Sequence, residues 1–431
     1  MAAAFGMAAV LAQHRRIDAS APAWLAPVLL LLALASNEGA VGLWPLAMAI
    51  IALLDPRRER WRDAVAWTAV CVAWVALWAV LGMGVHRSGI YADPTGDPLG
   101  SAVQLLTNAP VLLMSATTGV WADFFSFAAP GPRRIWWVVA ALATVVTVVV
   151  AVRLARRDRR AAVWSIGLLG AVLPTSGSFA SDRLLLLASL PAAALLAHLV
   201  RHLRDDRRAH RMAAVVAALV VFRHGVLNLL LAPIRARSME APQALVDRSV
   251  DSLDLDDAAD HVVVLVNPVS DALGAYAVVL DAVAGRDLPV AIHGLYAGLS
   301  ALTVERLDAT TLRLTPESPW MAHPSERLSR DPAVEPFSVG DRVRLPHMSI
   351  TVEAVSDDGR PSRTLVHFDR PLEDPLYQWH AWDVTRFRPF TPPAIGDSVQ
   401  LPASDPVAAW FGQRPEQPEL SGPEPPRSMH R

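Results

Sequence analysis

The first 235 residues alternate between apolar runs and clusters of arginine. A helix needs about 20 residues to cross the hydrocarbon core of a bilayer. The runs 64–83 and 135–152 reach or nearly reach this length, and the shorter runs need flanking residues or neighbouring helices. The pattern predicts an α-helical polytopic membrane bundle of about seven spans, at residues 22–36, 39–54, 64–83, 135–152, 161–175, 182–200 and 212–232.

The arginine clusters predict the orientation of this bundle, because cytoplasmic loops carry an excess of positive charge. Seven spans bring all four clusters to one side of the membrane, which is then the cytoplasm. The turn containing Glu38, the stretch 84–134, the turn before Asp182 and everything after about residue 233 then lie outside. The clusters are Arg15 with Arg16, residues 57–62, residues 153–160 and residues 201–211.

The stretch 101–128 is moderately apolar but contains Pro110, Thr117, Thr118 and Asp123. The orientation above requires this stretch to cross the membrane twice or not at all. We therefore predict a pair of interfacial or re-entrant helices, which occur at membrane depth where other parts of a protein cover them.

The net charge of −2 conceals two segments of opposite sign. Residues 1–235 contain 22 arginines and 12 acidic residues, whereas residues 236–431 contain 17 arginines and 29 acidic residues. This difference predicts a separate C-terminal part. We expect a transmembrane helical domain at 1–235, an acidic linker at 236–260, a small β-rich extracytoplasmic domain at 261–402 and a disordered, proline-rich tail at 403–431.

Short β-branched runs bounded by turn residues predict the strands of the β-rich domain. Two of these strands follow a repeated turn, Gly340-Asp341 and Gly396-Asp397. We expect a short helix at 274–284 and strands near 262–266, 301–307, 310–315, 341–345, 348–355, 363–369, 377–383 and 396–401.

The chain contains none of the common motifs of soluble enzymes: CxxC, HExxH, the P-loop, GxSxG and the dinucleotide fingerprint are all absent. It has a single cysteine, Cys71, and its 13 histidines are scattered, so we predict no metal site and no cofactor. Trp379 and Trp382 suggest a sugar-stacking platform. Their spacing puts them on opposite faces of a strand, however, which favours core packing for one of them.

Polar residues at the outer ends of the spans form the candidate binding site. Glu38 lies in the turn between the first two spans, and Asp182 and Arg183 open the sixth. Arginine binds phosphate through parallel hydrogen bonds and a carboxylate can act as a base, so these residues suit a phosphate-linked lipid. The alternative is that Asp182 caps its helix and Arg183 extends to the lipid headgroups.

A second polar pair, Arg223 and His224, lies within the last span. Such a pair is costly inside a membrane and is often functional. It can equally serve as a bundle-facing partner for another helix, and the sequence leaves both interpretations open.

Two stretches resemble the polytopic GT-C glycosyltransferases, in particular the bacterial branch similar to protein O-mannosyltransferases and their tetratricopeptide-bearing relatives. Residues 32–55, LALASNEGAVGLWPLAMAIIALLD, resemble a family helix that ends in Ser-Lys-Glu and is followed by an apolar helix with proline. Residues 179–197, FASDRLLLLASLPAAALLA, resemble the family's acidic-Arg pair and the sequence after it. The resemblance covers residues 1–200 and implies a polytopic membrane glycosyltransferase.

The chain also departs from the family pattern. Asn37 stands where the family has lysine, and leucines stand where it has tyrosines after the arginine. The family's catalytic acidic residue belongs to the first outer loop, which we expect to precede Met1, so the catalytic residue of this chain is unknown. The resemblance therefore implies only substrate or lipid-phosphate contacts for Glu38, Asp182 and Arg183.

We predict a bacterial multi-pass protein of the cell inner membrane. By the resemblance, it transfers a sugar from a polyprenyl-phosphate donor at the outer face of the membrane, as a hexosyltransferase or a catalytically incomplete relative. The alternative is a non-catalytic membrane protein whose outer β domain binds a cell-envelope polymer or protein. Both interpretations imply contact with membrane lipid and no nucleic-acid partner.

Overall fold

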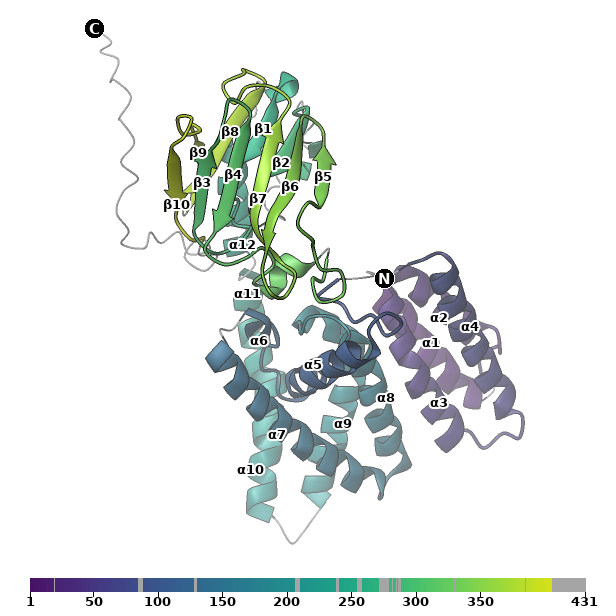
Figure 1. Ribbon diagram of the computed structural model, residues 1–431. Coiled ribbons are helices and arrows are strands. Elements are labelled where there is room, and N and C mark those ends of the chain that lie inside the picture. The colour runs from purple at the N-terminus through teal and green to yellow at the C-terminus, as the bar shows by residue number, and fades with distance from the viewer. Residues whose placement is uncertain are drawn as a thin grey trace. The chain divides into compact units, whose positions relative to one another are not determined.

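The chain divides into two units in the computed structural model, Met1–Pro233 and Ile234–Arg431 (Figure 1). The structure describes all residues except 19, 84–87, 128–129, 206–209, 238–239, 254–257, 271–278, 281, 284, 286–287, 329, 384 and 405–431. The predicted helix at 274–284 and the predicted tail at 403–431 lie for the most part outside the described residues.

The first unit is built of helices, and each apolar run predicted as a span is largely helical. Leucine and alanine, which dominate these runs, lose little conformational freedom in a helix. In chain order the elements are α1 (Ala2–Ile17), α2 (Leu25–Ser36), η1 (Glu38–Leu43), α3 (Trp44–Leu53), α4 (Arg60–Val80), α5 (Pro98–Thr118), α6 (Asp123–Phe127), α7 (Pro130–Ala155), α8 (Arg159–Thr175), η2 (Asp182–Leu185), α9 (Leu186–Asp205), α10 (His210–Val221), the π-helical turn η3 (Phe222–Leu227) and α11 (Asn228–Arg237).

Within the described residues, five helical segments are long and apolar enough to cross a membrane, judged by length and composition. The helices α2 and η1–α3 are apolar but shorter, and α8 has 17 residues. The helical unit is thus that of a membrane protein, with five membrane-length helices where we predicted about seven spans. The five segments are Arg60–Val80, Pro98–Thr118, Gly131–Ala155, Asp182–Arg204 and Ala214–Arg237.

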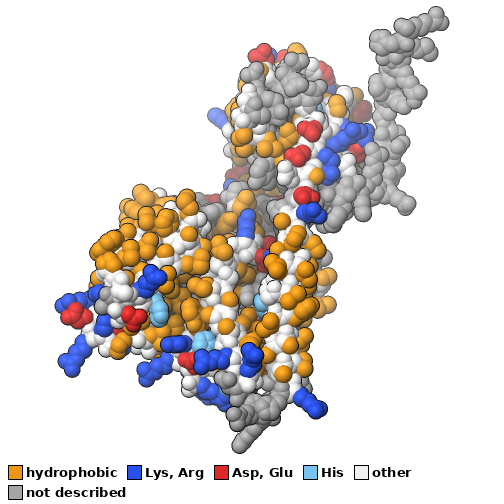
Figure 2. Space-filling view, turned by 180° about the vertical axis from the view of Figure 1, so that it is seen from behind, with side chains coloured by type: hydrophobic (Ala, Val, Ile, Leu, Met, Phe, Trp, Pro, Cys, Tyr) orange, Lys and Arg blue, Asp and Glu red, His pale blue; other side chains and the backbone are white. Residues whose placement is uncertain are grey.

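Apolar and charged side chains separate on the surface of the helical unit. Figure 2 shows a broad apolar band over the helices, with most of the arginine side chains toward one end. Arg16 and Arg57 both contact Asp63, at 3.7 and 2.6 Å. Arg157 Nη1 lies 2.6 Å from His202 Nε2. The first two arginine clusters therefore lie together, and so do the last two.

The stretch predicted as an interfacial or re-entrant helix pair forms the long helix α5 and the short helix α6. Gln104, Asn108 and Ser115 of α5 all form hydrogen bonds with the segment 176–182 that joins α8 to α9. These three side chains are spread over about 16 Å of helix. α5 therefore runs across the ends of α8 and α9, as Figure 1 shows, although its length and composition suit a membrane span.

Glycines let η1 and α3 approach α8 closely. A Cβ at Gly170 would lie 2.5 Å from Pro45 Cγ, and a Cβ at Gly167 would lie 2.6 Å from Leu46 Cδ1. A Cβ at Gly42 would lie 3.0 Å from the backbone of α8. Small residues at helix contacts allow such close packing in membrane proteins. These glycines therefore determine how η1 and α3 sit on α8.

A buried polar network holds the arginine-bearing ends of α1, α3 and α4. Trp67 Nε1 donates to Gln13 Oε1 at 2.9 Å, and Arg57 Nη2 donates to a carboxylate oxygen of Asp55 and of Asp63, each at 2.6 Å. Burial raises the pKa of Asp55, but the hydrogen bonds from Arg57 outweigh it and hold this pKa below its ordinary value. Removing one partner of such a network is costly, because it leaves a buried charge uncompensated.

The second unit contains two β-sheets. The four-stranded sheet has the order β2-β1-β8-β9, with β1 parallel to both β2 and β8. The six-stranded sheet has the order β10-β3-β4-β7-β6-β5 and is antiparallel. The elements are α12 (Glu240–Asp251), η4 (Ala258–Asp260), β1 (Val262–Leu265), β2 (Ala291–Gly294), β3 (Leu302–Arg306), β4 (Thr311–Pro316), η5 (Pro324–Arg327), β5 (Arg342–Leu345), β6 (Met348–Val355), β7 (Pro361–Phe368), β8 (Tyr377–Asp383), β9 (Arg386–Pro389) and β10 (Ser398–Leu401).

The strands predicted from the sequence are confirmed, and β8 covers the predicted residues 377–383. The strands β2 and β9 are additional. The segment 236–260, predicted as an acidic linker, contains the helix α12. Leu245 and Val250 of this helix pack onto one face of the four-stranded sheet, and so does Leu253, which follows the helix. It therefore belongs to the second unit.

The two sheets pack face to face around an apolar core. Val264 and Trp379 of the four-stranded sheet meet Leu314 and Val366 of the six-stranded sheet in this core. Trp382, on the opposite face of β8, packs with α12. Trp379 and Trp382 are 7% and 2% exposed. Both tryptophans are thus core residues, which excludes a sugar-stacking platform at these positions.

The repeated turns Gly340-Asp341 and Gly396-Asp397 are also structurally equivalent. In each turn the glycine N–H donates to a carbonyl of the neighbouring strand, and the N–H of the same strand residue donates back to the aspartate carbonyl. The partner residues are Val352 and Arg306, with distances between 2.8 and 3.0 Å. Both glycines have positive φ, +93° and +90°, which glycine adopts at low cost. The repeat therefore encodes the same entry turn at both edges of the six-stranded sheet.

We predict that Gly170→Ala destabilises the helical unit, because the added Cβ would meet the rigid ring of Pro45. Inserting a methyl group into a packed contact costs about 1–3 kcal/mol, which thermal unfolding in detergent would detect as a lower midpoint. Gly131→Ala is the matched control, since a Cβ there meets no atom within 4 Å. Equal midpoints for the two variants would contradict the packing role of Gly170.

Candidate functional site

The turn between α8 and α9 is held by side chains of α5 and α6. Asn108 Nδ2 donates to the carbonyl oxygens of Ser176 and Ser178, at 3.2 and 2.6 Å. Ser126 Oγ donates to the carbonyl oxygen of Ala180 at 2.7 Å. A backbone carbonyl inside an apolar unit needs such partners, because leaving it unpaired is costly. The polar residues of α5 and α6 therefore satisfy the carbonyls of a turn that lies 54 to 70 residues further along the chain.

Asp182 follows this turn directly and begins η2. Its Oδ1 accepts hydrogen bonds from Ser115 Oγ at 2.6 Å and from the Ala122 N–H at 3.0 Å. The N–H of Asp182 donates to Asp123 Oδ2 at 3.4 Å. Two acidic residues, Asp182 and Asp123, thus lie next to each other, and Asp182 joins η2 to α5 and α6.

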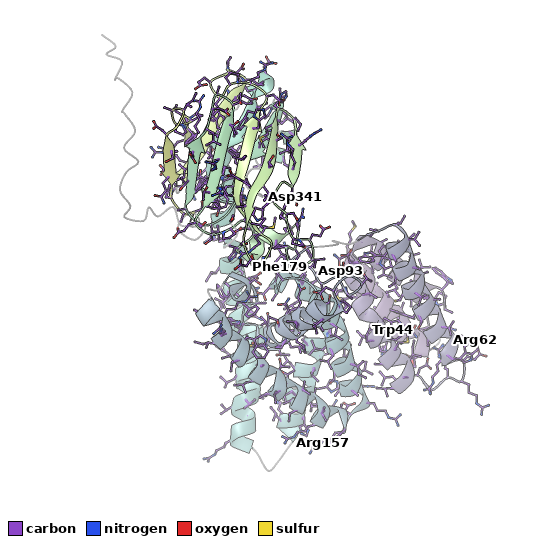
Figure 3. All side chains as sticks on the ribbon, viewed as in Figure 1. Trp44, Arg62, Asp93, Arg157, Phe179 and Asp341 are labelled. Atoms are coloured by element: carbon purple, nitrogen blue, oxygen red, sulfur yellow. The ribbon has the colours of Figure 1, made fainter. Side chains whose placement is uncertain are left out.

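Two arginines lie over phenylalanine rings that are close in the chain to these carboxylates. Arg183 Cζ lies 5.0 Å from the ring centroid of Phe179, and Arg133 Cζ lies 4.7 Å from that of Phe125. A stacked guanidinium keeps its N–H donors in the plane parallel to the ring, where they can bind an anion. Phe179 belongs to the α8–α9 turn. Figure 3 shows it at one end of the helical unit, with Arg157 at the opposite end.

Glu38 lies on a different element from Asp182 and Arg183. It opens η1, and its side chain is exposed. The preceding Asn37 accepts a hydrogen bond from the Gly39 N–H at 2.9 Å. The structure thus brings Asp182 and Arg183 together with α5 and α6. The hydrogen bonds of Asp182 described above do not include Glu38.

Arg223 and His224 both contact the carboxyl end of α5. Arg223 donates to the carbonyl oxygen of Gly119 and to Asn228 Oδ1. His224 Nε2 lies 2.9 Å from the carbonyl oxygen of Thr117. A positive charge at the carboxyl end of a helix is favourable. Of the two interpretations of this pair, the structure supports a partner for another helix.

The residues of α5 that bind the α8–α9 turn and Asp182 were not predicted. Gln104, Asn108 and Ser115 are separated by four and seven residues, which is the spacing of one helix face. Polar residues on one face of an apolar helix indicate contact with polar groups. This pattern in the sequence could have predicted that α5 has polar contacts. What they contact is not encoded locally, because the turn they bind belongs to another pair of helices.

No group of three or more His, Cys, Asp or Glu side chains within the described part of the chain is arranged to hold a metal ion. Comparison with known proteins gives no relative: no family model, curated protein or solved structure matches this chain. The fold is that of a membrane protein with a helical unit and a β-sheet unit. The candidate site is therefore described from the contacts of this chain alone.

We predict that Asp182→Ala lowers the thermal stability of the protein, because Ser115 Oγ and the Ala122 N–H lose their acceptor. Both donors belong to buried residues, and leaving a buried donor unsatisfied costs about 1–3 kcal/mol. Asp182→Asn is the matched control, since its amide keeps an oxygen acceptor in the same place. Thermal unfolding in detergent should give a lower midpoint for the alanine variant than for the asparagine variant. The same midpoint for both would mean that these hydrogen bonds do not hold η2.

Proposed function

We propose that the helical unit spans the cell inner membrane with its arginine-rich turns in the cytoplasm and the α5–α6 end outside. The positive-inside rule supports this orientation. At the α6 end, Phe124 stacks with Trp121 and packs against Trp136, with ring centroids 5.2 and 6.1 Å apart, and such aromatic residues are enriched at membrane–water boundaries. α10 begins near Arg211, and Ala214–Arg237 has the length of one crossing. The second unit then follows on the outer side.

We propose that the α5–α6 end binds the phosphate of a polyprenyl-phosphate-linked sugar. The observation that carries this proposal is the pair of stacked arginines, Arg183 and Arg133, beside the carboxylates Asp182 and Asp123. Arginines bind phosphate oxygens strongly, and carboxylates accept hydrogen bonds from sugar hydroxyl groups. The valine-rich surface of α7, which begins near these arginines, suits the apolar polyprenyl chain.

The reaction that fits this ligand is sugar transfer, as in the glycosyltransferases that the sequence resembles. An acceptor hydroxyl attacks the anomeric carbon, the bond from that carbon to the phosphate oxygen breaks, polyprenyl phosphate leaves, and the hydroxyl proton is released to water. Arg183 and Arg133 would stabilise the charge that develops on the leaving phosphate. We assign no catalytic base. Asp182 Oδ1 already accepts two hydrogen bonds from the protein itself, which gives this carboxylate a structural role.

We predict that Arg183→Ala weakens the capture of undecaprenyl phosphate by the protein in nanodiscs about tenfold, since one charged hydrogen bond contributes about 1.5–3 kcal/mol. Arg133→Ala should weaken capture similarly. Arg58→Ala is the matched control, because Arg58 is an exposed arginine in the turn between α3 and α4. Capture by Arg183→Ala at the wild-type level would contradict the site.

A transfer assay tests the reaction itself. The wild-type protein, supplied with a radiolabelled polyprenyl-phosphate hexose and membrane acceptors, should transfer the label. Arg183→Ala and Asp182→Asn should abolish transfer without lowering the thermal midpoint. Full transfer by both variants would contradict the assignment of these residues.

A second candidate function is a non-catalytic membrane protein whose outer domain binds a cell-envelope polymer or protein. It is favoured by the structural hydrogen bonds of Asp182 and by the polar face of the six-stranded sheet. On that face Arg313 donates to Glu353 and Glu305, and Arg363 pairs with Glu353, at 2.8–3.0 Å. The hydrogen bond from Arg313 holds the pKa of Glu353 below its ordinary value. A wild-type protein that captures the lipid but transfers no sugar would favour this second function.

A further inference from the structure

The helix that runs from α10 to α11 changes its winding at η3. A π-helical turn is rare, adds a residue to the turn and is frequently found at functional sites. Arg223 and His224 are adjacent residues of η3, and both contact α5. In a regular α-helix, adjacent residues point about 100° apart. Here both side chains nevertheless contact the same end of α5.

The contacts of η3 concentrate on the last turn of α5. Gly119 is the C-cap of α5 with φ of +72°, and a Cβ there would lie 2.6 Å from Arg223 Nη2. The carbonyl oxygen of Gly119 accepts a hydrogen bond from Arg223, and the carbonyl oxygen of Thr117 contacts His224 Nε2. Carbonyls at a helix end have no partner within the helix. Arg223 and His224 therefore satisfy these carbonyls, and the charge of Arg223 complements the negative end of the helix dipole.

The residues held in this way flank the two donors to Asp182. Ser115, two residues before Thr117, donates its hydroxyl to Asp182 Oδ1, and Ala122, three residues after Gly119, donates its N–H to the same atom. A displacement of residues 117–119 would move both donors. Only two or three residues separate each donor from the held carbonyls, so the backbone between them is too short to compensate.

We propose that Arg223 and His224 are positioning residues for the lipid-phosphate site. By holding the carboxyl end of α5, they fix the two donors that orient Asp182, and so they fix the adjacent Arg183. We call the contacts of Arg223 and His224 with the carboxyl end of α5 the clamp. The clamp itself is independent of any ligand, whereas its effect on lipid capture rests on the proposed function.

The clamp is tested by the accessibility of a cysteine at Val120, which is 36% exposed and follows Gly119. Cys71 is the sole cysteine of the chain, so a Cys71→Ala background makes the probe unique. In this background, Arg223→Leu should speed the labelling of Val120→Cys by a membrane-impermeant maleimide about tenfold, as expected for losing one charged hydrogen bond. Arg223→Lys keeps a donor and should restore part of the protection. Arg211→Leu, on the exposed first turn of α10, is the matched control and should label at the unsubstituted rate.

Undecaprenyl phosphate capture in nanodiscs is measured on the same variants. Faster labelling together with weaker capture in Arg223→Leu, with the thermal midpoint unchanged or restored by Arg223→Lys, supports the proposal. Unchanged labelling overturns it, because the clamp does not exist. Faster labelling with unchanged capture also overturns it, because the clamp does not serve the site. Absence of capture by the unsubstituted protein overturns the proposed function instead, and labelling then decides the clamp alone.

Discussion

The organisation of the helical unit depends on how the turn between α8 and α9 satisfies its backbone carbonyls. A turn that begins inside an apolar bundle cannot rely on water for every carbonyl. Asn108 serves Ser176 and Ser178, and Ser126 serves Ala180. To reach these carbonyls from one helix face, α5 has to run across the turn. This requirement explains why a helix with the length of a membrane span lies across the ends of its neighbours.

Much of the fold could be predicted from the sequence, because its signals are local. The apolar runs between arginine clusters gave helices, and the alternating run 377–383 gave β8 with the correct bounds. The strands β2 and β9 have four residues each, and their sequences, AIHG and RFRP, are too short to show a strand pattern. α12 was assigned to a linker because its acidic composition outweighed its few apolar residues. These elements owe their structure to packing against β1, β8 and each other, which no local pattern encodes.

The candidate site was predicted only in part, for the same reason. Asp182 and Arg183 were identified by their place at the end of an apolar run, and the structure keeps them together. Glu38 was grouped with them because all three were expected on one side of the membrane, yet it lies on η1, which packs on α8 through glycine contacts. Ser115 could not be linked to Asp182, because this contact joins residues 67 positions apart.

The hydrogen bonds of Asp182 also limit its chemistry. Its Oδ1 accepts from the Ser115 hydroxyl and from the Ala122 N–H, so this oxygen is already engaged by the protein. Asp182 therefore holds η2, which also carries its neighbour Arg183. Arg183 differs, since stacking on Phe179 orients its guanidinium without consuming its N–H donors. Within this pair, the aspartate holds the backbone of η2 through its hydrogen bonds, and the arginine places a positive charge over the Phe179 ring.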